Sequence, residues 1–204
     1  HEELSILFME TLNKEFKGEL SLAIKIFQNQ YHKKFLHQLV SSQLDVDRLD
    51  YLRRDSFYTG VSEGIVGSDR IIKMLNVVND QLVVEAKGIH SIEKFLISRW
   101  LMYWQVYLHK TVVSAEQLLI KIFKRVKFLI DYEKDVYLTE ELKFLMNNSK
   151  TNKSNIPSIL ENFSAIDDND VFSLIKKWAK SSDKVLCTLS ERLLNRNLLK
   201  IEIQ

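Results

Sequence analysis

The chain has 204 residues, 46% of them hydrophobic, which is enough apolar material to bury the core of one domain with a small appendage. Its formal net charge of +2 at pH 7 is close to neutral, and this balance argues against a nucleic-acid binder or a membrane-surface protein. The single cysteine, Cys187, excludes an intrachain disulfide and a cysteine-based zinc site and favours a reducing compartment.

Targeting signals are missing from the sequence. Charged residues interrupt every apolar stretch before the ~18 residues that a membrane-spanning helix needs. The first residues lack the basic start and apolar middle of a signal peptide, so we expect a cytoplasmic protein with no membrane partner. The chain begins inside an apparent helix that has no N-terminal cap and stops in a stretch that alternates like a strand. We therefore expect a fragment of a longer protein.

The first third of the chain has apolar side chains at helical spacing. This spacing predicts helices over residues 3–16, 20–28 and 31–41. Asp45 suits the N-cap of a fourth helix, because its carboxylate can accept hydrogen bonds from free backbone amides near residues 47 and 48. Three glycines between residues 60 and 67 then indicate a loop.

The remaining two thirds predict one small β element among further helices. Residues 77–84 predict a hairpin that turns at Asn79-Asp80. Residues 91–130 predict one long, aromatic-rich helix, and Asp183 or its neighbour Ser182 suits the cap of the last helix. Residues 198–204 alternate as a strand does. The predicted fold class is mainly α, with a small β-hairpin and a C-terminal strand.

The densest charge pattern lies at residues 44–55, where four acids and three arginines share twelve positions. Asp47, Tyr51 and Asp55 are four residues apart and share one helical face. A carboxylate on a rigid helix can complete a hard-metal site, with Arg and Tyr beside it to hold phosphate oxygens. The alternative is a helix laced with weak surface salt bridges. We assign that alternative to Asp50, Arg53 and Arg54.

A second polar face lies on the long predicted helix and consists of Arg99, Tyr103, Tyr107 and Lys110. Such a face would suit an anionic ligand that carries a ring or a sugar. The alternative is a stripe at the edge of the core, with buried tyrosine rings and solvated hydroxyls, and this helix alone favours that alternative. The basic residues between 121 and 127 are interpreted as a solvated face, so nucleic acid is not an expected partner.

These residues together resemble a known family. The run SQLDVDRLDYLRRD at residues 42–55, with Tyr-Thr-Gly-Val at 58–61, is similar to the segment that follows the HD motif in HD-domain superfamily phosphohydrolases. Agreement extends to His1-Glu2, to Arg99 and Tyr107-x-His109-Lys110, and to residues 195–200. The resemblance implies an HD-domain-like helical bundle. It places the C-terminal part of the helical core in residues 1–76 and a helical extension in residues 77–204.

The resemblance also implies roles for individual residues. Asp47 is similar to the last carboxylate ligand of the HD metal centre, and His1 to a catalytic histidine near the scissile phosphate. Three residues resemble the groups that hold the triphosphate of a nucleotide substrate in this family: Arg48, Tyr51 and Arg99. Asp55 and Tyr107 resemble the residues that contact the sugar of that nucleotide. Tyr103 and Leu108 stand where the nucleotide triphosphohydrolases of this family carry His and Gln, which leaves the identity of the substrate open.

The other metal ligands of this family lie in an upstream histidine and a His-Asp dipeptide, and no His-Asp dipeptide occurs here. One aspartate cannot hold a divalent ion tightly against water. We expect that the intact parent uses a divalent metal to hydrolyse (deoxy)nucleoside triphosphates or another phosphate ester, and that this chain alone has neither metal nor activity. Family members form dimers or tetramers, so a homo-oligomer is expected. The alternative is a non-catalytic helical module for oligomerisation or nucleotide sensing.

Overall fold

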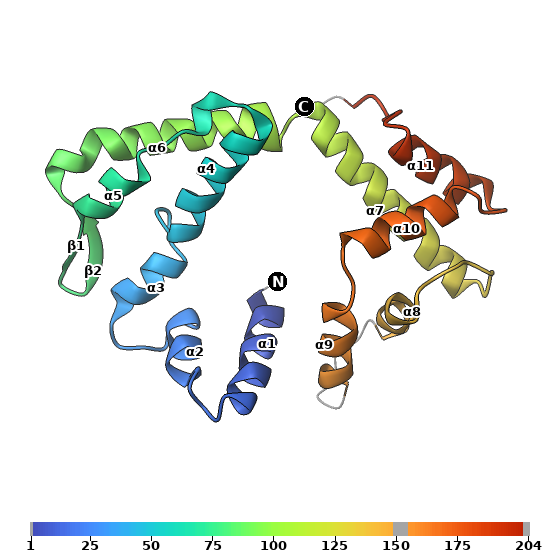
Figure 1. The fold of residues 1–204 in the computed structure, drawn as a ribbon, viewed down its shortest axis with the longest axis horizontal. Coiled ribbons are helices and arrows are strands. Elements are labelled where there is room, and N and C mark those ends of the chain that lie inside the picture. The colour runs from blue at the N-terminus through green and yellow to red at the C-terminus, as the bar shows by residue number, and fades with distance from the viewer. Residues whose placement is uncertain (1, 149–154, 202–204) are drawn as a thin grey trace. The chain divides into compact units, whose positions relative to one another are not determined.

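The computed structural model describes residues 2–148 and 155–201. The chain divides into two compact units, His1–His109 and Lys110–Gln204. Both units consist mainly of helices, and the first contains a small antiparallel hairpin (Figure 1). The predicted mainly α class with a small hairpin is confirmed.

The first unit holds the shorter helices and the hairpin. Its elements are α1 (Glu2–Glu15), α2 (Ser21–Phe27), α3 (Lys34–Val40), α4 (Val46–Thr59), η1 (Ser62–Gly64), α5 (Ser68–Met74), β1 (Leu75–Val78), β2 (Gln81–Val84), η2 (Ala86–Gly88) and α6 (Ile89–Met102), which continues into the π-helical turn η3 (Tyr103–Tyr107). The hairpin turns at Asn79 and Asp80, which both have positive φ, as a tight two-residue turn requires.

The hairpin is tied to α3 by side-chain hydrogen bonds. Asp80 Oδ2 accepts from the backbone N–H of Lys34 at 2.7 Å and so satisfies a free amide at the start of α3. Gln38 Oε1 accepts from the backbone N–H of Leu82 at 2.7 Å. Because of these contacts the hairpin lies inside the first unit. The compact units divide at residue 109, and the boundary between residues 76 and 77 stays a prediction from the sequence.

The core of the first unit lies between α4, α5 and α6. Its buried residues are Leu49, Leu52, Val66, Ile71, Phe95 and Met102. Gly64 allows the close approach of these elements, because a Cβ at this position would lie 2.8 Å from both Met102 Sδ and Ser56 Cβ. One face of α4 is thus fixed in the core, which leaves its other faces to carry polar groups.

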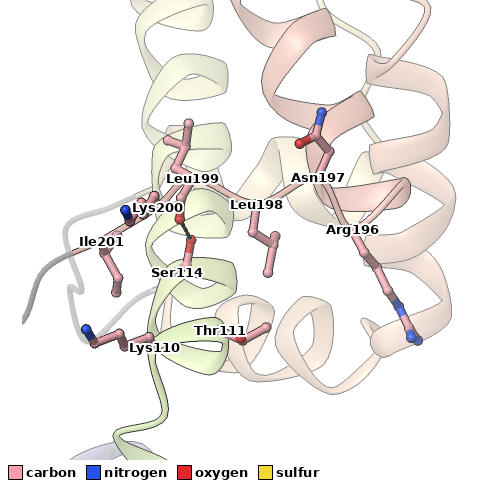
Figure 2. Close-up of a pocket in the computed structure, with 9 residues that line it drawn as sticks. All are labelled: Lys110, Thr111, Ser114, Arg196, Asn197, Leu198, Leu199, Lys200 and Ile201. Atoms are coloured by element: carbon pink, nitrogen blue, oxygen red, sulfur yellow. Dashed lines mark hydrogen bonds between the residues drawn. The ribbon is translucent and has the colours of Figure 1, made fainter.

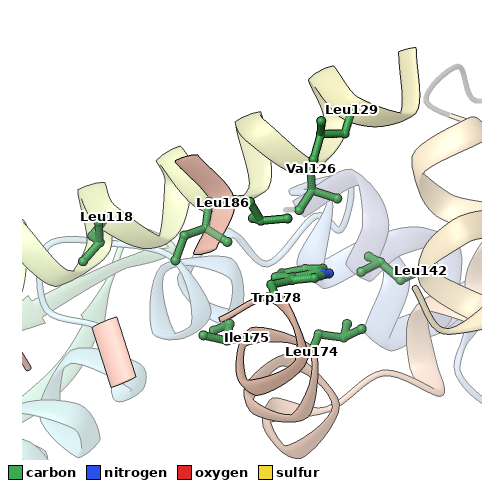
Figure 3. Packing of buried hydrophobic residues seen from close by; sticks show 9 residues of the cluster. Leu118, Val126, Leu129, Leu142, Leu174, Ile175, Trp178 and Leu186 are labelled. Atoms are coloured by element: carbon green, nitrogen blue, oxygen red, sulfur yellow. The ribbon is translucent and has the colours of Figure 1, made fainter. Parts of the chain in front are cut away.

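The second unit is a set of helices around α7. Its elements are α7 (Lys110–Asp131), α8 (Glu140–Asn147), α9 (Ile156–Ser164), α10 (Asp168–Trp178) and α11 (Lys184–Leu194). Leu118, Ile122, Val126 and Leu129 recur at helical spacing along α7 and pack against α10 and α11 (Figure 3). At the centre Trp178 is 1% exposed, and its Nε1–H donates to the backbone oxygen of Tyr137 at 2.8 Å.

The predicted C-terminal strand is wrong for the residues that the structure describes. Residues 198–201 form no strand, and residues 202–204 lie outside the described residues. The Ser114 hydroxyl of α7 donates to the backbone oxygen of Leu199 at 2.6 Å. This carbonyl is therefore satisfied by a helix side chain, and the apolar alternation of the segment serves to pack Leu198 on the core.

Asp183 caps α11, as predicted, and also pairs with α7. Its Oδ1 accepts from the Leu186 amide at 2.8 Å, and Arg125 Nε and Nη2 donate to its two oxygens at 3.0 and 2.6 Å. The guanidinium of Arg125 lowers the pKa of Asp183 from 3.8 to about 2, and the Leu186 amide acts in the same direction. The two side chains are only 25% and 18% exposed, so solvent screens this pair little.

Asp183→Asn is expected to lower the free energy of unfolding of the second unit by about 2 kcal/mol at neutral pH. The folded-state pKa is depressed, so the stabilisation is complete above pH about 4 and is lost as the pH falls toward about 2. Asparagine keeps the cap and removes only the charge. Urea denaturation of both proteins at several pH values checks this. A difference that persists unchanged at pH 2 would contradict it.

Candidate functional site

Helix α4 begins in a tight arrangement of polar groups. The buried carboxylate of Asp45 accepts from the backbone N–H of Arg48 at 2.8 Å and of Ser42 at 3.2 Å, which confirms the predicted N-cap. Gly60 ends the helix in the left-handed conformation, with φ of 71°. Leu49 and Leu52 anchor the helix in the core. The side chains of the predicted face are thus carried by a rigid element.

The polar faces of α4 and η3 meet at Asp55. The Tyr107 hydroxyl donates to Asp55 Oδ2 at 2.7 Å, and the rings of Tyr51 and Tyr107 lie edge to face with centroids 6.0 Å apart. Burial raises the pKa of Tyr107 well above its usual range, and the hydrogen bond to Asp55 adds to this effect. Burial likewise raises the pKa of Tyr51. Both hydroxyls therefore stay protonated at neutral pH and can act as hydrogen-bond donors.

Arg99 extends the same surface. Its Nη1 donates to Gln43 Oε1 at 3.0 Å, and its guanidinium carbon lies 5.8 Å from the centre of the Tyr103 ring. Tyr103 in turn packs edge to face on Tyr107, with centroids 5.2 Å apart. The structure therefore brings together four of the predicted site residues, with Gln43 and Tyr103 beside them. We call this set the tyrosine wall; it consists of Gln43, Tyr51, Asp55, Arg99, Tyr103 and Tyr107.

The long helix predicted over residues 91–130 is wrong, because the helix is broken. Residues Tyr103–Tyr107 form a π-helical turn, in which the Leu108 amide bonds to the oxygen of Tyr103 at 2.7 Å. The helix stops there, and α7 starts anew at Lys110. Lys110 thus belongs to the second unit and does not share a continuous helical face with Arg99. π-Helical turns are frequent at functional sites, and here the turn carries both Tyr103 and Tyr107.

Arg48 is a predicted triphosphate contact, but here its side chain bonds to the loop that precedes α4. Its guanidinium pairs with Asp45 and donates to the backbone oxygen of Ser42. Its buried Nε has no hydrogen-bond partner among the residues that the structure describes. Arg48 therefore braces the start of the helix here, and it would have to release these contacts to bind a phosphate.

Asp47 lies on α4 four residues before Tyr51 of the tyrosine wall and borders a hollow. Its exposed side chain lines this hollow of about 680 Å³, which residues of α1, α3 and the loops around α2 also line. His37 and Glu2 line this hollow too, and His37 Nδ1 lies 3.0 Å from the oxygen of Ile26. Within residues 2–148 and 155–201, no three His, Cys, Asp or Glu side chains converge as metal ligands would. The described donors therefore do not by themselves fit a divalent ion. His1 lies outside the described residues.

The basic face of α7 is partly neutralised. Arg125 pairs with Asp183, and Lys127 Nζ lies 2.9 Å from Asp131 Oδ1. These two ion pairs offset part of the positive charge of residues 121–127. In the described part of the chain, no helix combines the length and apolar character that crossing a membrane requires.

Comparison with known proteins gives the following relatives. A family described as "HD associated region" matches residues 66–146. The uncharacterized protein YwfO of Bacillus subtilis is 34% identical over 94% of this chain and 42% of its own length. A deoxynucleoside triphosphate triphosphohydrolase SAMHD1 homolog of Dictyostelium discoideum is 26% identical over 60% of this chain and 26% of its own length.

A solved structure is also similar. The crystal structure of a phosphohydrolase from Bacteroides thetaiotaomicron has a TM-score of 0.91 and 55% identity, over 97% of this chain and 50% of that chain. The chain spans about half the length of the curated relatives that it matches first, with shares of 42%, 41% and 51%. Together these matches support a relationship to the HD superfamily and to its hydrolases.

Proposed function

We propose that this chain is the C-terminal part of a metal-dependent HD-type phosphohydrolase, whose intact form hydrolyses nucleoside or deoxynucleoside triphosphates. The observation that carries the proposal is the tyrosine wall, in which the Asp55–Tyr107 hydrogen bond joins α4 to η3 beside Arg99. One permanent cation, two protonated hydroxyls and exposed aromatic edges suit a ligand with phosphates, a sugar and a ring. The similar Bacteroides protein is itself described as a phosphohydrolase.

The residues have distinct parts in this proposal. Arg99 and the Tyr51 hydroxyl hold phosphate oxygens, and Arg48 joins them once it leaves Asp45 and Ser42. Asp55 accepts a hydrogen bond from a sugar hydroxyl, and the bond from Tyr107 holds its carboxylate in place. Positive charge close to the phosphates offsets the negative charge that gathers on their oxygens as the P–O bond breaks.

Asp47 supplies a single hard oxygen donor in this proposal. The described residues hold too few donors for a metal, so the remaining ligands come from the part of the parent outside this chain. A divalent ion bound in such a site lowers the pKa of water and polarises phosphoryl oxygens. The chain alone is therefore expected to be inactive.

A hydrolysis screen tests the proposed function. The intact parent and the 204-residue chain are each incubated with dNTPs, NTPs and cyclic nucleotides in the presence of Mn²⁺ or Mg²⁺. We expect the parent to hydrolyse a nucleoside triphosphate and the chain to hydrolyse none. Hydrolysis by the purified chain, or a stoichiometric metal in it, would overturn the division of the site between two parts. A parent inactive on every nucleotide would overturn the phosphohydrolase itself.

A nucleotide-sensing module is the second candidate, and one feature of the second unit supports it. A hollow of about 610 Å³ between the start of α7 and residues 196–201 is lined by Lys110, Arg196 and Lys200 (Figure 2). Three cations around one hollow raise the local concentration of polyanions such as triphosphates. If equilibrium dialysis shows that the chain binds a nucleoside triphosphate, and neither the chain nor the parent hydrolyses it in the screen, this candidate is favoured.

A further inference from the structure

A single loop holds both arginines of the proposed phosphate site. This loop consists of residues 42–45, between α3 and α4, and we call it the arginine loop. Its Gln43 Oε1 accepts from Arg99 Nη1 at 3.0 Å. Its Asp45 carboxylate pairs with the guanidinium of Arg48, which also donates to the backbone oxygen of Ser42. Oxygen atoms of one short segment thus bind N–H donors that a phosphate would also bind.

The two arginines act on the same hydroxyl of the tyrosine wall. Burial raises the pKa of Tyr51, and the positive charges of Arg99 and Arg48 both act in the opposite direction. Both guanidinium groups therefore contribute to the electrostatic field at this hydroxyl. An anion that accepts a hydrogen bond from Tyr51 is attracted by both of them.

The contact that the loop makes with Arg99 leaves this arginine available to a ligand. The oxygen of Gln43 is neutral and the side chain is exposed, so Arg99 keeps its full positive charge. The guanidinium carbon of Arg99 also lies 5.8 Å from the centre of the Tyr103 ring. These two contacts fix the direction of the guanidinium and leave most of its N–H donors to other acceptors.

The contact that the loop makes with Arg48 neutralises this arginine. Asp45 is 3% exposed, so solvent screens its attraction for the guanidinium little. The carboxylate also accepts from the backbone amides of Arg48 and Ser42 at 2.8 and 3.2 Å, and these bonds hold it in place. A phosphate that approaches Arg48 must therefore compete with a fixed internal anion, whereas a phosphate that approaches Arg99 competes with a neutral amide.

We propose that the arginine loop controls the affinity of the site for phosphates: Gln43 positions Arg99 for binding, and Asp45 keeps Arg48 away from the ligand. Gln43 is then a positioning residue, because it acts on the ligand through Arg99. The ion pair of Asp45 with Arg48 fixes the start of α4 and lowers the affinity for a polyphosphate. This inference rests on the proposed roles of Arg48 and Arg99 as phosphate contacts.

Substitutions in the loop are expected to change phosphate affinity in opposite directions. Gln43→Met keeps the length of the side chain and removes the acceptor, so we expect binding of inorganic tripolyphosphate to weaken at least about fivefold. Asp45→Asn keeps an oxygen for the helix cap and removes the charge that holds Arg48, so we expect binding to tighten at least about fivefold. A loss of local structure would only weaken binding, so the gain distinguishes this role of Asp45 from a structural one.

Isothermal titration calorimetry of the 204-residue chain at low ionic strength measures these affinities. All the proteins carry Lys110→Ala and Lys200→Ala, which weaken the cationic hollow of the second unit as a competing site. Asp50→Asn is the matched control, because it removes the same charge from α4 and releases Arg54 from an exposed salt bridge. We expect this control to change the affinity for tripolyphosphate by less than about twofold.

A combined substitution checks that the gain comes from Arg48. Asp45→Asn together with Arg48→Met is expected to bind tripolyphosphate no more tightly than the chain with an unsubstituted loop, and tighter binding would overturn the proposal. The proposal is also overturned if Asp45→Asn fails to raise the affinity, if Gln43→Met fails to lower it, or if the chain shows no saturable binding. Tripolyphosphate has no sugar and no base, and the measurement needs no hydrolysis. A parent that is inactive in the hydrolysis screen would therefore overturn the proposed function and leave the opposite changes in affinity in place.

Discussion

Asp47→Ala is expected to lower nucleotide hydrolysis by the intact parent at least ~100-fold, because in the proposed site Asp47 binds the metal directly, and even the loss of a residue that only orients a metal ligand costs about 10–100-fold. Asp47 is exposed and faces a hollow, so the substitution removes no core contact. Its carboxylate lies in the first turn of α4, where it also interacts with the helix dipole at a cost of under ~1 kcal/mol on removal. The thermal midpoint should therefore change little while activity falls.

The matched control for this substitution is Asp50→Ala. Asp50 lies one turn further along α4, is exposed, and pairs with Arg54 at 2.9 Å in a salt bridge of the weak surface type. We expect the Asp50→Ala parent to hydrolyse nucleotides at a rate within about twofold of that of the unsubstituted parent. Metal content of the purified proteins gives an independent readout, and it should fall for Asp47→Ala alone. Activity that survives Asp47→Ala would remove Asp47 from the metal site and leave the tyrosine wall proposal standing.

Local chemistry explains which parts of the fold were predictable from sequence. The cap at Asp45, the cap at Asp183 and the turn at Asn79-Asp80 each depend on a few neighbouring residues. The meeting of Asp55 with Tyr107 could be expected only from the resemblance, since the two residues are 52 positions apart. Helical spacing within α4 put Tyr51 and Asp55 on one face, but it could not say what that face meets.

Tertiary context explains the errors. No proline or glycine marks the break after η3, so the pattern of residues 91–130 is that of one helix. The sequence gives no sign of a role for Gln43, because its bond to Arg99 joins residues 56 positions apart. Arg48 stands beside a predicted phosphate site and so suggests a ligand contact, although Asp45, the carboxylate that it pairs with, is only three residues away.

Trp178→Ala is expected to destabilise the second unit by about 3–5 kcal/mol, the usual cost of removing a large buried aromatic side chain. Trp178 is 1% exposed and packs edge to face on Phe123, with centroids 5.7 Å apart. The substitution leaves a cavity between α7 and α10 and removes the Nε1 hydrogen bond to the oxygen of Tyr137. A loss of this size is a large part of the stability of a domain with about 100 residues.

Phe172→Ala is the control on the same helix, because Phe172 is 56% exposed and its truncation should cost under ~1 kcal/mol. Hydrogen exchange in urea is the measurement, because it reports the stability of the two units separately. Protection should fall in α7, α10 and α11 and remain in α4 and α6, since the two units have separate cores. Equal loss of protection in both units would mean that they unfold together as one cooperative structure. It would contradict the expectation that each core unfolds by itself.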